Sequence, residues 1–187
     1  VDIPLQDNPS HHPPPQLSLK DSLWLGQFQA MASDCQILLE GVDQLQAETF
    51  LKLATIETWR IEHKFSRYKT GNTMDQINHA YKQALSVDDE TTALLNFADQ
   101  CYQLSDGLFD VTAGVLRKIW KFNGSDHIPT SQQIDEILPL IGWHKVHWKA
   151  QNIKLPEAME LDLGGIGKEY AVDKVRLLLQ KKIPQTK

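Results

Sequence analysis

The sequence predicts an α+β fold, with a mixed sheet and several packed helices. Helix-periodic segments and short strand-like runs both occur, but they do not alternate regularly as they do in βαβ proteins. The chain shows no internal repeat and no run of about eighteen apolar residues that could span a membrane. At 187 residues it is long enough for one domain with a sizeable core. We expect this domain to cover residues 20–187.

Residues 1–19 are expected to form an extended tail, because their composition differs from that of the remaining chain. They hold five of the nine prolines, and His11 and His12 stand directly before three of them. Such a segment is disordered or lies along the surface. The histidine pair could bind a metal, although a solvated linker is the simpler interpretation.

The first half of the domain predicts a strand followed by helices. Residues 27–40 favour a strand, and the side chains expected to be buried in it are Phe28, Cys35, Ile37 and Leu39. Residues 31–34 interrupt this strand with small and polar side chains, which indicates a bulge or a place where a ligand approaches the backbone. Residues 45–62 predict a long helix, with one face formed by Leu45, Leu53, Ile56 and Trp59.

Two capping-box patterns mark the starts of later helices. The pair Ser86 and Asp89 precedes a helix whose buried stripe would consist of Leu94, Phe97, Ala98 and Cys101. The pair Thr130 and Gln133 precedes a helix with core positions at Ile134, Ile137 and Leu138. Further short strands are expected at residues 143–148, 153–155 and 159–163. A final helix is expected at residues 168–180, with its inward positions at Val172, Val175 and Leu179.

Charge, cysteine and histidine content exclude several classes of protein. A net charge of −5 and a pI near 5.8 argue against a nucleic-acid-binding protein, which normally carries a basic face. Cys35 and Cys101 cannot form a disulfide framework and lack CxxC spacing, so we expect small buried thiols. His144 and His147 would point to opposite faces of the expected strand, and the other histidines have no partners at metal-ligand spacing. A zinc site is therefore not expected.

The most informative segment runs from Met159 to Asp173. A strand-like run ends in Asp162, passes through a glycine-rich turn and enters a helix whose first turn carries Lys168. Backbone N–H groups at a helix start, with glycines that let a ligand come close, make a seat for an anion such as phosphate. Asp162 adds either a hydrogen-bond acceptor or a ligand for a hard cation. The segment therefore suggests a phosphate-bearing ligand.

Two other clusters allow either a structural or a functional interpretation. In residues 65–69 an aromatic side chain lies beside basic ones, which would suit a flat heterocycle and a phosphate, or simply a half-exposed strand end. In residues 105–114 the glycine Gly107 suits a left-handed helix end, and Asp110 or Thr112 could cap a short helix at residues 115–120.

Taken in order, these segments resemble the motifs of the ApbE-type FAD:protein FMN transferases. The resemblance covers the chain from about Gln27 to its end, and several motifs in one order at matching spacing are hard to obtain by accident. The corresponding segments are Met31-Ala32-Ser33, Ser66-Arg67-Tyr68, Gly107 to Gly114, Leu116 to Phe122, and Asp162 to Asp173.

The resemblance implies an enzyme that uses FAD and Mg²⁺. Family members cleave the pyrophosphate of FAD and pass FMN to a Ser or Thr hydroxyl of a target flavoprotein, and some instead hydrolyse FAD to FMN and AMP. By position, the residues implied to contact FAD are Met31, Tyr68, Leu108, Phe109, Asp110, Asp162 and Lys168. The backbone carbonyl of Gly165 is implied as a ligand for Mg²⁺, an ion that prefers oxygen ligands and would neutralise the pyrophosphate while AMP leaves.

The chain departs from the family pattern in single residues and in length. Ala32 and Glu169 stand where glycine is common, and Val115 stands where proline is common. The family continues past the position of Lys187 and carries its side-chain Mg²⁺ ligands there. We therefore expect residues 1–187 alone to bind FAD weakly and to have little transferase activity, because one backbone carbonyl is a weak anchor for a strongly hydrated ion.

Two alternatives to the transferase stay open from the sequence. One is a non-catalytic flavin-binding or interaction module, and the other is an FAD pyrophosphatase that yields FMN and AMP. The location is an expectation by analogy with relatives: the periplasm, with a possible lipid anchor to the inner membrane through a lost N-terminal lipoprotein signal, or otherwise the cytoplasm. The proline-rich residues 1–19 would suit such a membrane tether.

Overall fold

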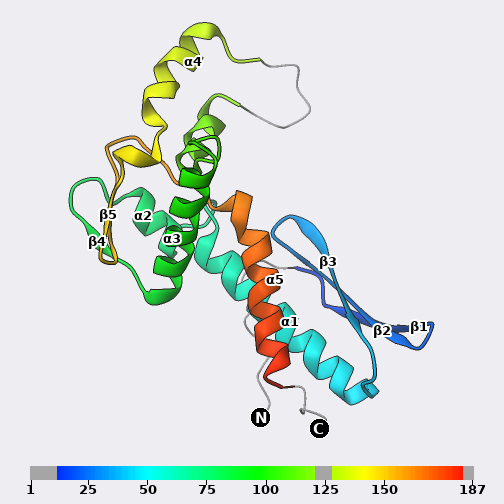
Figure 1. Ribbon diagram of the computed structural model, residues 1–187. Coiled ribbons are helices and arrows are strands. Elements are labelled where there is room, and N and C mark those ends of the chain that lie inside the picture. The colour runs from blue at the N-terminus through cyan, green and yellow to red at the C-terminus, as the bar shows by residue number, and fades with distance from the viewer. Residues whose placement is uncertain (1–11, 121–127, 183–187) are drawn as a thin grey trace. The chain divides into compact units, whose positions relative to one another are not determined.

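The computed structural model describes residues 12–120 and 128–182, which divide into two compact units. The first unit consists of residues 12–64 and 167–182, and the second of residues 65–120 and 128–166. Helices and strands occur in both units, so the predicted α+β class is confirmed (Figure 1). In place of one mixed sheet, the described strands form two three-stranded antiparallel sheets. Residues 1–11 of the expected tail lie outside the described residues, as does the end of the predicted Leu116 to Phe122 segment.

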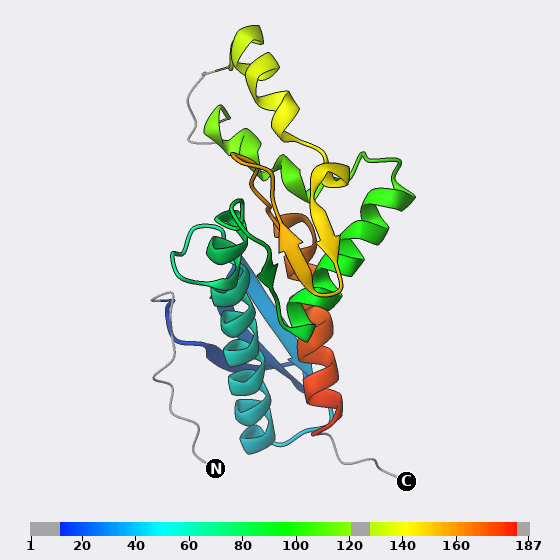
Figure 2. The same cartoon turned by 90° about the vertical axis from the view of Figure 1, so that its left-hand side faces the viewer.

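The sheet of the first unit has the strand order β1-β2-β3, formed by Gln16–Lys20, Leu23–Ala30 and Ser33–Leu39. Residues 16–19, expected in the tail, are therefore part of β1. Two helices, α1 (Gln44–Phe65) and α5 (Gly164–Gln180), pack on one face of this sheet (Figures 1 and 2). Leu39 from the sheet, Phe50 from α1 and Leu179 from α5 meet in the core of this unit.

The predicted strand at residues 27–40 is wrong, because the chain reverses in its middle. Ala30 pairs with Ser33, so Met31 and Ala32 form a two-residue hairpin loop between β2 and β3. Both residues have positive φ angles, 51° and 54°, as a type I′ turn requires. Such turns are normally marked by Asn or Gly, and the absence of that signal explains why the sequence suggested a bulge instead.

The long helix predicted at residues 45–62 is confirmed as α1, but its buried face differs from the prediction. Leu45 is 73% exposed, whereas Ala47, Phe50 and Leu51 are buried. Near the other end of α1, His12 lies 2.8 Å from Glu62 and stacks on Trp59 with the ring centroids 5.7 Å apart. The described end of the proline-rich segment therefore lies against α1.

The second unit holds short helices around a small sheet. Its helical elements are α2 (Thr73–Asn78), α3 (Asp89–Leu104), η1 (Val111–Lys118), α4 (Ser131–Ile137), η2 (Leu138–Leu140) and η3 (Trp143–Lys145). Its strands are β4 (Leu85–Ser86), β5 (His147–Lys149) and β6 (Asn152–Lys154), in the order β4-β6-β5. Fully buried side chains of this core include Met74, Ile77, Leu94, Leu95, Val115, Ile153, Leu155, Leu161 and Leu163.

One predicted capping box is confirmed and the other is wrong. Thr130 and Gln133 make the reciprocal hydrogen bonds of a capping box at the start of α4. At the start of α3 the cap is Asp88, whose carboxylate accepts a hydrogen bond from the Thr91 N–H, while Ser86 belongs to β4. The buried stripe of α3 also differs, because Phe97 is 49% exposed.

The region before α5 contains less sheet than predicted. The strand expected at residues 143–148 is split into η3 and β5, so the argument that placed His144 and His147 on one strand is wrong. Residues 159–163 form no strand, although Met159, Leu161 and Leu163 are buried. Their alternating burial produced the strand-like pattern without a sheet partner. Helix α5 starts at Gly164, four residues before the predicted start. None of the described helices is long and apolar enough to cross a membrane.

Candidate functional site

In the second unit, the candidate site is built around Asp162 and the first turn of α5. The Asp162 N–H donates to the Val111 carbonyl at 2.7 Å, and its Oδ1 accepts from the Gly164 N–H at 2.9 Å. These two bonds fix the carboxylate where α5 begins. The first N–H groups of a helix have no partners within the helix, and a negative charge at this end is favourable.

Arg67 connects Asp162 with a loop 95 residues earlier in the sequence. Its Nη1 donates to Asp162 Oδ2 at 2.6 Å, and its Nη2 donates to the Tyr68 hydroxyl at 2.8 Å. The guanidinium carbon also lies 5.0 Å from the centroid of the Tyr68 ring. Tyr68 is 76% exposed, so an aromatic ring stands in solvent beside the Asp162 carboxylate.

Two asparagines hold the backbone on which this site stands. Asn72 caps α2 by accepting from the Asp75 N–H, and its side chain donates to the Ser66 carbonyl at 2.6 Å. The Asn78 side chain donates to the Leu161 carbonyl and accepts from the Leu161 N–H. The loop at residues 66–72 and the residue before Asp162 are therefore both fixed by side-chain hydrogen bonds.

Glycines permit a close approach of two neighbouring segments to Asp162 and α5. A Cβ atom on Gly114 would lie 2.7 Å from the Cβ of Asp162, so only glycine fits there. A Cβ atom on Gly165 would lie 3.0 Å from the Phe109 ring, which shows that this ring packs directly on the first turn of α5. Phe109 and Gly165, both predicted site residues, are therefore neighbours.

Asp110 has a structural role in this structure. Its Oδ1 accepts from the N–H and the hydroxyl of Thr112, and its Oδ2 accepts from the Trp143 N–H at 2.9 Å. Asp110 is thus the N-cap of η1, as one of the two sequence interpretations has it. The neighbouring Leu108 is 92% exposed. Gly107 has φ 81°, the left-handed conformation expected after a helix.

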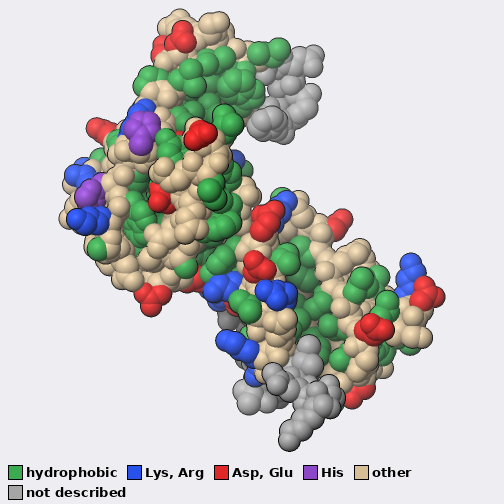
Figure 3. Space-filling model, viewed as in Figure 1, with side chains coloured by type: hydrophobic (Ala, Val, Ile, Leu, Met, Phe, Trp, Pro, Cys, Tyr) green, Lys and Arg blue, Asp and Glu red, His purple; other side chains and the backbone are tan. Residues whose placement is uncertain are grey.

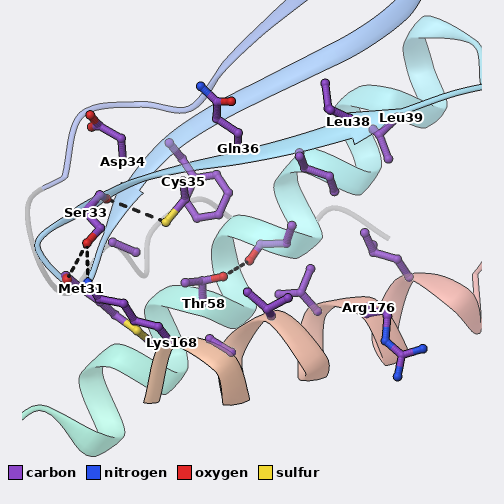
Figure 4. Close-up of a pocket in the computed structure, with 18 of the residues that line it drawn as sticks. Met31, Ser33, Asp34, Cys35, Gln36, Leu38, Leu39, Thr58, Lys168 and Arg176 are labelled. Atoms are coloured by element: carbon purple, nitrogen blue, oxygen red, sulfur yellow. Dashed lines mark hydrogen bonds between the residues drawn. The ribbon is translucent and has the colours of Figure 1, made fainter. Parts of the chain in front are cut away.

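In the first unit, Met31 and Lys168 come together at the β2–β3 loop. The Lys168 ammonium donates to Ser33 Oγ at 2.7 Å, and Ser33 Oγ donates in turn to the Met31 carbonyl at 3.4 Å (Figure 4). Both Met31 and Lys168 line a pocket of about 670 Å³ between β3, α1 and α5. Its walls are mostly apolar, and Figure 3 shows hydrophobic side chains gathered in this part of the first unit.

Cys35 lies in the wall of the same pocket. Burial raises the pKa of its thiol above the usual value of 9.0, and the charges of Glu62 and Asp34 act in the same direction. Hydrogen bonding at Ala30 and the charge of Lys168 oppose this rise without cancelling it. Cys35 is therefore a protonated thiol at neutral pH, but Cys35 and Cys101 are only half-buried, whereas the sequence predicted buried thiols.

The described residues contain no cluster of three side chains of the kinds that usually hold a metal ion. Among residues 12–120 and 128–182, no three His, Cys, Asp or Glu side chains gather where they could hold a metal ion. Gly165 lies in the first turn of α5, where a backbone carbonyl is an acceptor within the helical hydrogen-bond pattern. Both oxygens of Asp162 already accept hydrogen bonds. The role of Gly165 toward Mg²⁺ stays a prediction.

The structure therefore gathers the predicted residues in two groups, one in each unit. Met31 and Lys168 are joined through Ser33 in the first unit. In the second unit, Tyr68 is joined to Asp162 through Arg67, and Phe109 packs on Gly165. Leu108 follows Gly107 in an exposed position, and Asp110 serves the local fold.

Arg67 and Ser33 were missed as site residues, although both stand inside predicted motifs. Arg67 sits between Ser66 and Tyr68, and a basic residue beside an aromatic one is the signal that could have identified it. Its partner Asp162 is too distant in the sequence for any local pattern to reveal the ion pair. Ser33 would have been found only by expecting the hairpin that brings it toward Lys168.

Comparison with known proteins points to one family. The model of the ApbE family matches residues 31–185. The chain is 30% identical to the FAD:protein FMN transferase of Chlamydia trachomatis over 118 residues, which are 60% of this chain and 37% of that protein. It is 24% identical to the enzyme of the same name from Chlamydia muridarum over 164 residues, 86% of this chain and 46% of that protein.

Solved structures agree with the fold. The ApbE protein of Thermotoga maritima superimposes with a TM-score of 0.75 at 27% identity, over 83% of this chain and 52% of that protein. The flavinyl transferase ApbE of Pseudomonas stutzeri, at 20% identity, shares the fold with a TM-score of 0.72, over 88% of this chain and 56% of that protein. The chain thus spans about half the length of these proteins. Since the family match covers residues 31–185 of 187, the chain belongs to the ApbE family.

Proposed function

We propose that this chain is part of an enzyme that transfers FMN from FAD to a Ser or Thr hydroxyl of an acceptor flavoprotein. Family membership and relatives named FAD:protein FMN transferase support this proposal. The observation that carries it is the arrangement of an exposed aromatic ring, an arginine and an aspartate at the start of α5. The Tyr68 ring offers a surface for a flat ring system, and the backbone N–H groups at the start of α5 offer donors for a pyrophosphate.

The reaction places simple demands on the protein. The acceptor oxygen attacks the phosphorus of the FMN half, and the bond from that phosphorus to the bridging oxygen breaks. AMP leaves with the bridging oxygen, and the hydroxyl proton passes to solvent. Such phosphoryl chemistry depends mainly on positioning and on stabilising negative charge. The N–H groups of the first turn of α5 and the Lys168 ammonium would stabilise the negative charge of the phosphates. Tyr68 would hold the isoalloxazine. Met31, Leu108 and Phe109 would add apolar contacts with FAD.

Magnesium dependence is a further part of the proposal. When bound, Mg²⁺ would neutralise negative charge on the pyrophosphate, and it usually binds through one or two carboxylates together with substrate phosphates. Among the described residues, no group of three or more His, Cys, Asp or Glu side chains is placed to hold a metal ion. We therefore propose that its side-chain ligands come from the part of the family's length that this chain does not span.

Product analysis on the full-length gene product tests the proposal. The protein is incubated with FAD and an acceptor flavoprotein, with Mg²⁺ or with a chelator, and AMP, free FMN and protein-bound FMN are measured. Transfer yields AMP together with FMN on the acceptor, only when Mg²⁺ is present. Free FMN in equal amount to AMP would identify an FAD pyrophosphatase instead. Binding of FAD without release of AMP would identify a flavin-binding module.

A comparison of chain lengths follows from the same proposal. A fluorescence titration should show weak FAD binding by residues 1–187 alone and tighter, Mg²⁺-dependent binding by the full-length gene product. Tight, Mg²⁺-dependent binding by residues 1–187 would contradict the proposed origin of the metal ligands.

The periplasm is proposed as the site of action, with the proline-rich residues that precede β1 as a link to a lipid anchor. Only the resemblance and the proline-rich composition support this location. Fractionation of cells that express the full-length gene tests it. Recovery of the protein with cytoplasmic markers would support the cytoplasmic alternative.

A further inference from the structure

Arg67 makes two directed contacts with residues for which we propose a role toward FAD. One arm of its guanidinium reaches the Asp162 carboxylate at 2.6 Å, and the other reaches the Tyr68 hydroxyl at 2.8 Å. A planar guanidinium offers donors in a fixed fork, whereas a lysine ammonium offers one compact charge. Only arginine among the natural side chains can satisfy both acceptors in this way.

The ion pair differs from an ordinary surface pair. The side chains of Arg67 and Asp162 are 20% and 30% exposed. The second oxygen of Asp162 accepts from the Gly164 N–H, and the Asp162 N–H bonds to Val111. Arg67 therefore binds a carboxylate that is already fixed from two other directions, so its own position is well defined.

The charge of Arg67 also matters for an anionic ligand. A carboxylate at the start of α5 without a partner would repel a pyrophosphate that approaches the same helix end. Paired with Arg67, Asp162 adds little net charge there. At the same time the guanidinium lies 5.0 Å from the centroid of the Tyr68 ring and limits how that ring can turn.

We propose that Arg67 is a positioning residue of the flavin site, which fixes Asp162 and Tyr68 relative to each other and neutralises Asp162. This inference rests on the proposed function, because it assigns Arg67 a role in binding FAD. Arg67 is not among the residues that the sequence predicted to contact FAD.

FAD titrations of the full-length gene product test this role with three single variants. Loss of charge-assisted hydrogen bonds in Arg67→Ala should weaken FAD binding by about tenfold or more. Arg67→Lys keeps the positive charge but loses the forked donor geometry. This variant should therefore bind FAD more tightly than Arg67→Ala but more weakly than the wild type. Arg117→Ala is the matched control, because it removes an ion pair with Glu160 at 2.9 Å in the same unit, outside the proposed site. Its affinity for FAD should equal that of the wild type.

A combined variant separates positioning from direct contact. If Arg67 acts through Asp162 and Tyr68, adding Arg67→Ala to a protein that already carries Asp162→Asn and Tyr68→Phe should weaken FAD binding little further. Losses that multiply would show that Arg67 binds FAD by itself, and the positioning role would be wrong. Thermal melting of each variant shows whether it is folded before its affinity is compared.

The remaining outcomes separate this inference from the proposed function. Wild-type affinity in Arg67→Ala, with FAD bound by the wild type, would overturn the role of Arg67 and leave the function standing. An equal loss in Arg117→Ala would also overturn it, because the effect would then be general to the unit. No FAD binding by the wild type would overturn both.

Discussion

At the scale of single residues, the side chains predicted to contact FAD differ in how far they are already engaged in hydrogen bonds within the protein. The Asp110 carboxylate accepts three internal hydrogen bonds, and Lys168 donates to Ser33. The Tyr68 side chain accepts one hydrogen bond from Arg67 at its hydroxyl, and Tyr68 is 76% exposed. Of these three, Tyr68 has the side chain most available to a ligand.

Tyr68 should contribute to FAD binding mainly through its ring. Tyr68→Ala removes the stacking surface and should weaken FAD binding by about tenfold, whereas Tyr68→Phe keeps the ring and should lose less. Quenching of flavin fluorescence by the full-length gene product measures both affinities. Equal affinity in wild type and Tyr68→Ala would show that the isoalloxazine does not lie on this ring.

Asp110 should matter for stability, because its carboxylate joins η1 to the start of η3. Asp110→Asn replaces one acceptor oxygen by an NH₂ group that faces a donor, so it should lower the free energy of unfolding by about 1–3 kcal/mol. Chemical denaturation measures this loss. Asp106→Asn is the control, since Asp106 is exposed and asparagine tolerates its φ of 52°. Equal stability of Asp110→Asn and wild type would contradict the capping role.

At the scale of helices and strands, the sequence predicted those features that depend on near neighbours. Thr130 and Gln133, three positions apart, cap α4, and the sequence predicted this capping box correctly. The β2–β3 hairpin was not predicted, because Met31 and Ala32 carry no turn signal and their positive φ angles are unusual for residues other than glycine. Residues 159–163 alternate in burial because core side chains enclose them, so periodicity alone suggested a strand.

The hairpin loop gives a prediction about stability. Ala32 has φ 54°, a conformation that costs an L-residue about 1–2 kcal/mol and glycine almost nothing. Glycine loses more backbone entropy on folding, so Ala32→Gly should stabilise the protein by a net amount of about 0.5 kcal/mol. Urea unfolding measures the change. Gln36→Gly, in the middle of β3, should instead destabilise, and a loss of stability in both variants would contradict the turn assignment.

At the scale of the whole molecule, stability should depend on pH because of the titration of Glu160. Burial alone would raise the pKa of this carboxyl, but hydrogen bonds and attraction from Lys118 and Arg117 outweigh it and hold the pKa below the usual 4.5. The folded protein therefore binds fewer protons than the unfolded chain around this pH. The stabilisation is present above the unfolded pKa and is lost as the pH falls through the folded pKa.

Glu160→Gln should remove this acid-dependent part of stability. The variant should be less stable than the wild type at pH 7, and the difference should shrink as the pH falls below about 4.5. Denaturation at a series of pH values measures the difference. Glu157→Gln removes the same charge from an exposed side chain nearby and serves as the control. A difference that stays constant from pH 7 to pH 3 would exclude the linkage.

The site was predictable at this scale only through the family pattern, and only in part. The pattern identified Tyr68 and Asp162, which the structure joins, but not Arg67, which joins them. Residue spacing could not show that a side chain would bridge two loops, because the backbones of these loops are held by hydrogen bonds from Asn72 and Asn78 that depend on the tertiary fold.

The pocket beside Cys35 has a practical consequence for handling the protein. Its lining is mostly apolar and includes Val172, which is 67% exposed, so we expect environment-sensitive dyes to bind the folded protein here. A melting assay based on dye fluorescence would then begin from a bright baseline at room temperature. Circular dichroism or tryptophan emission would report unfolding of this chain more faithfully.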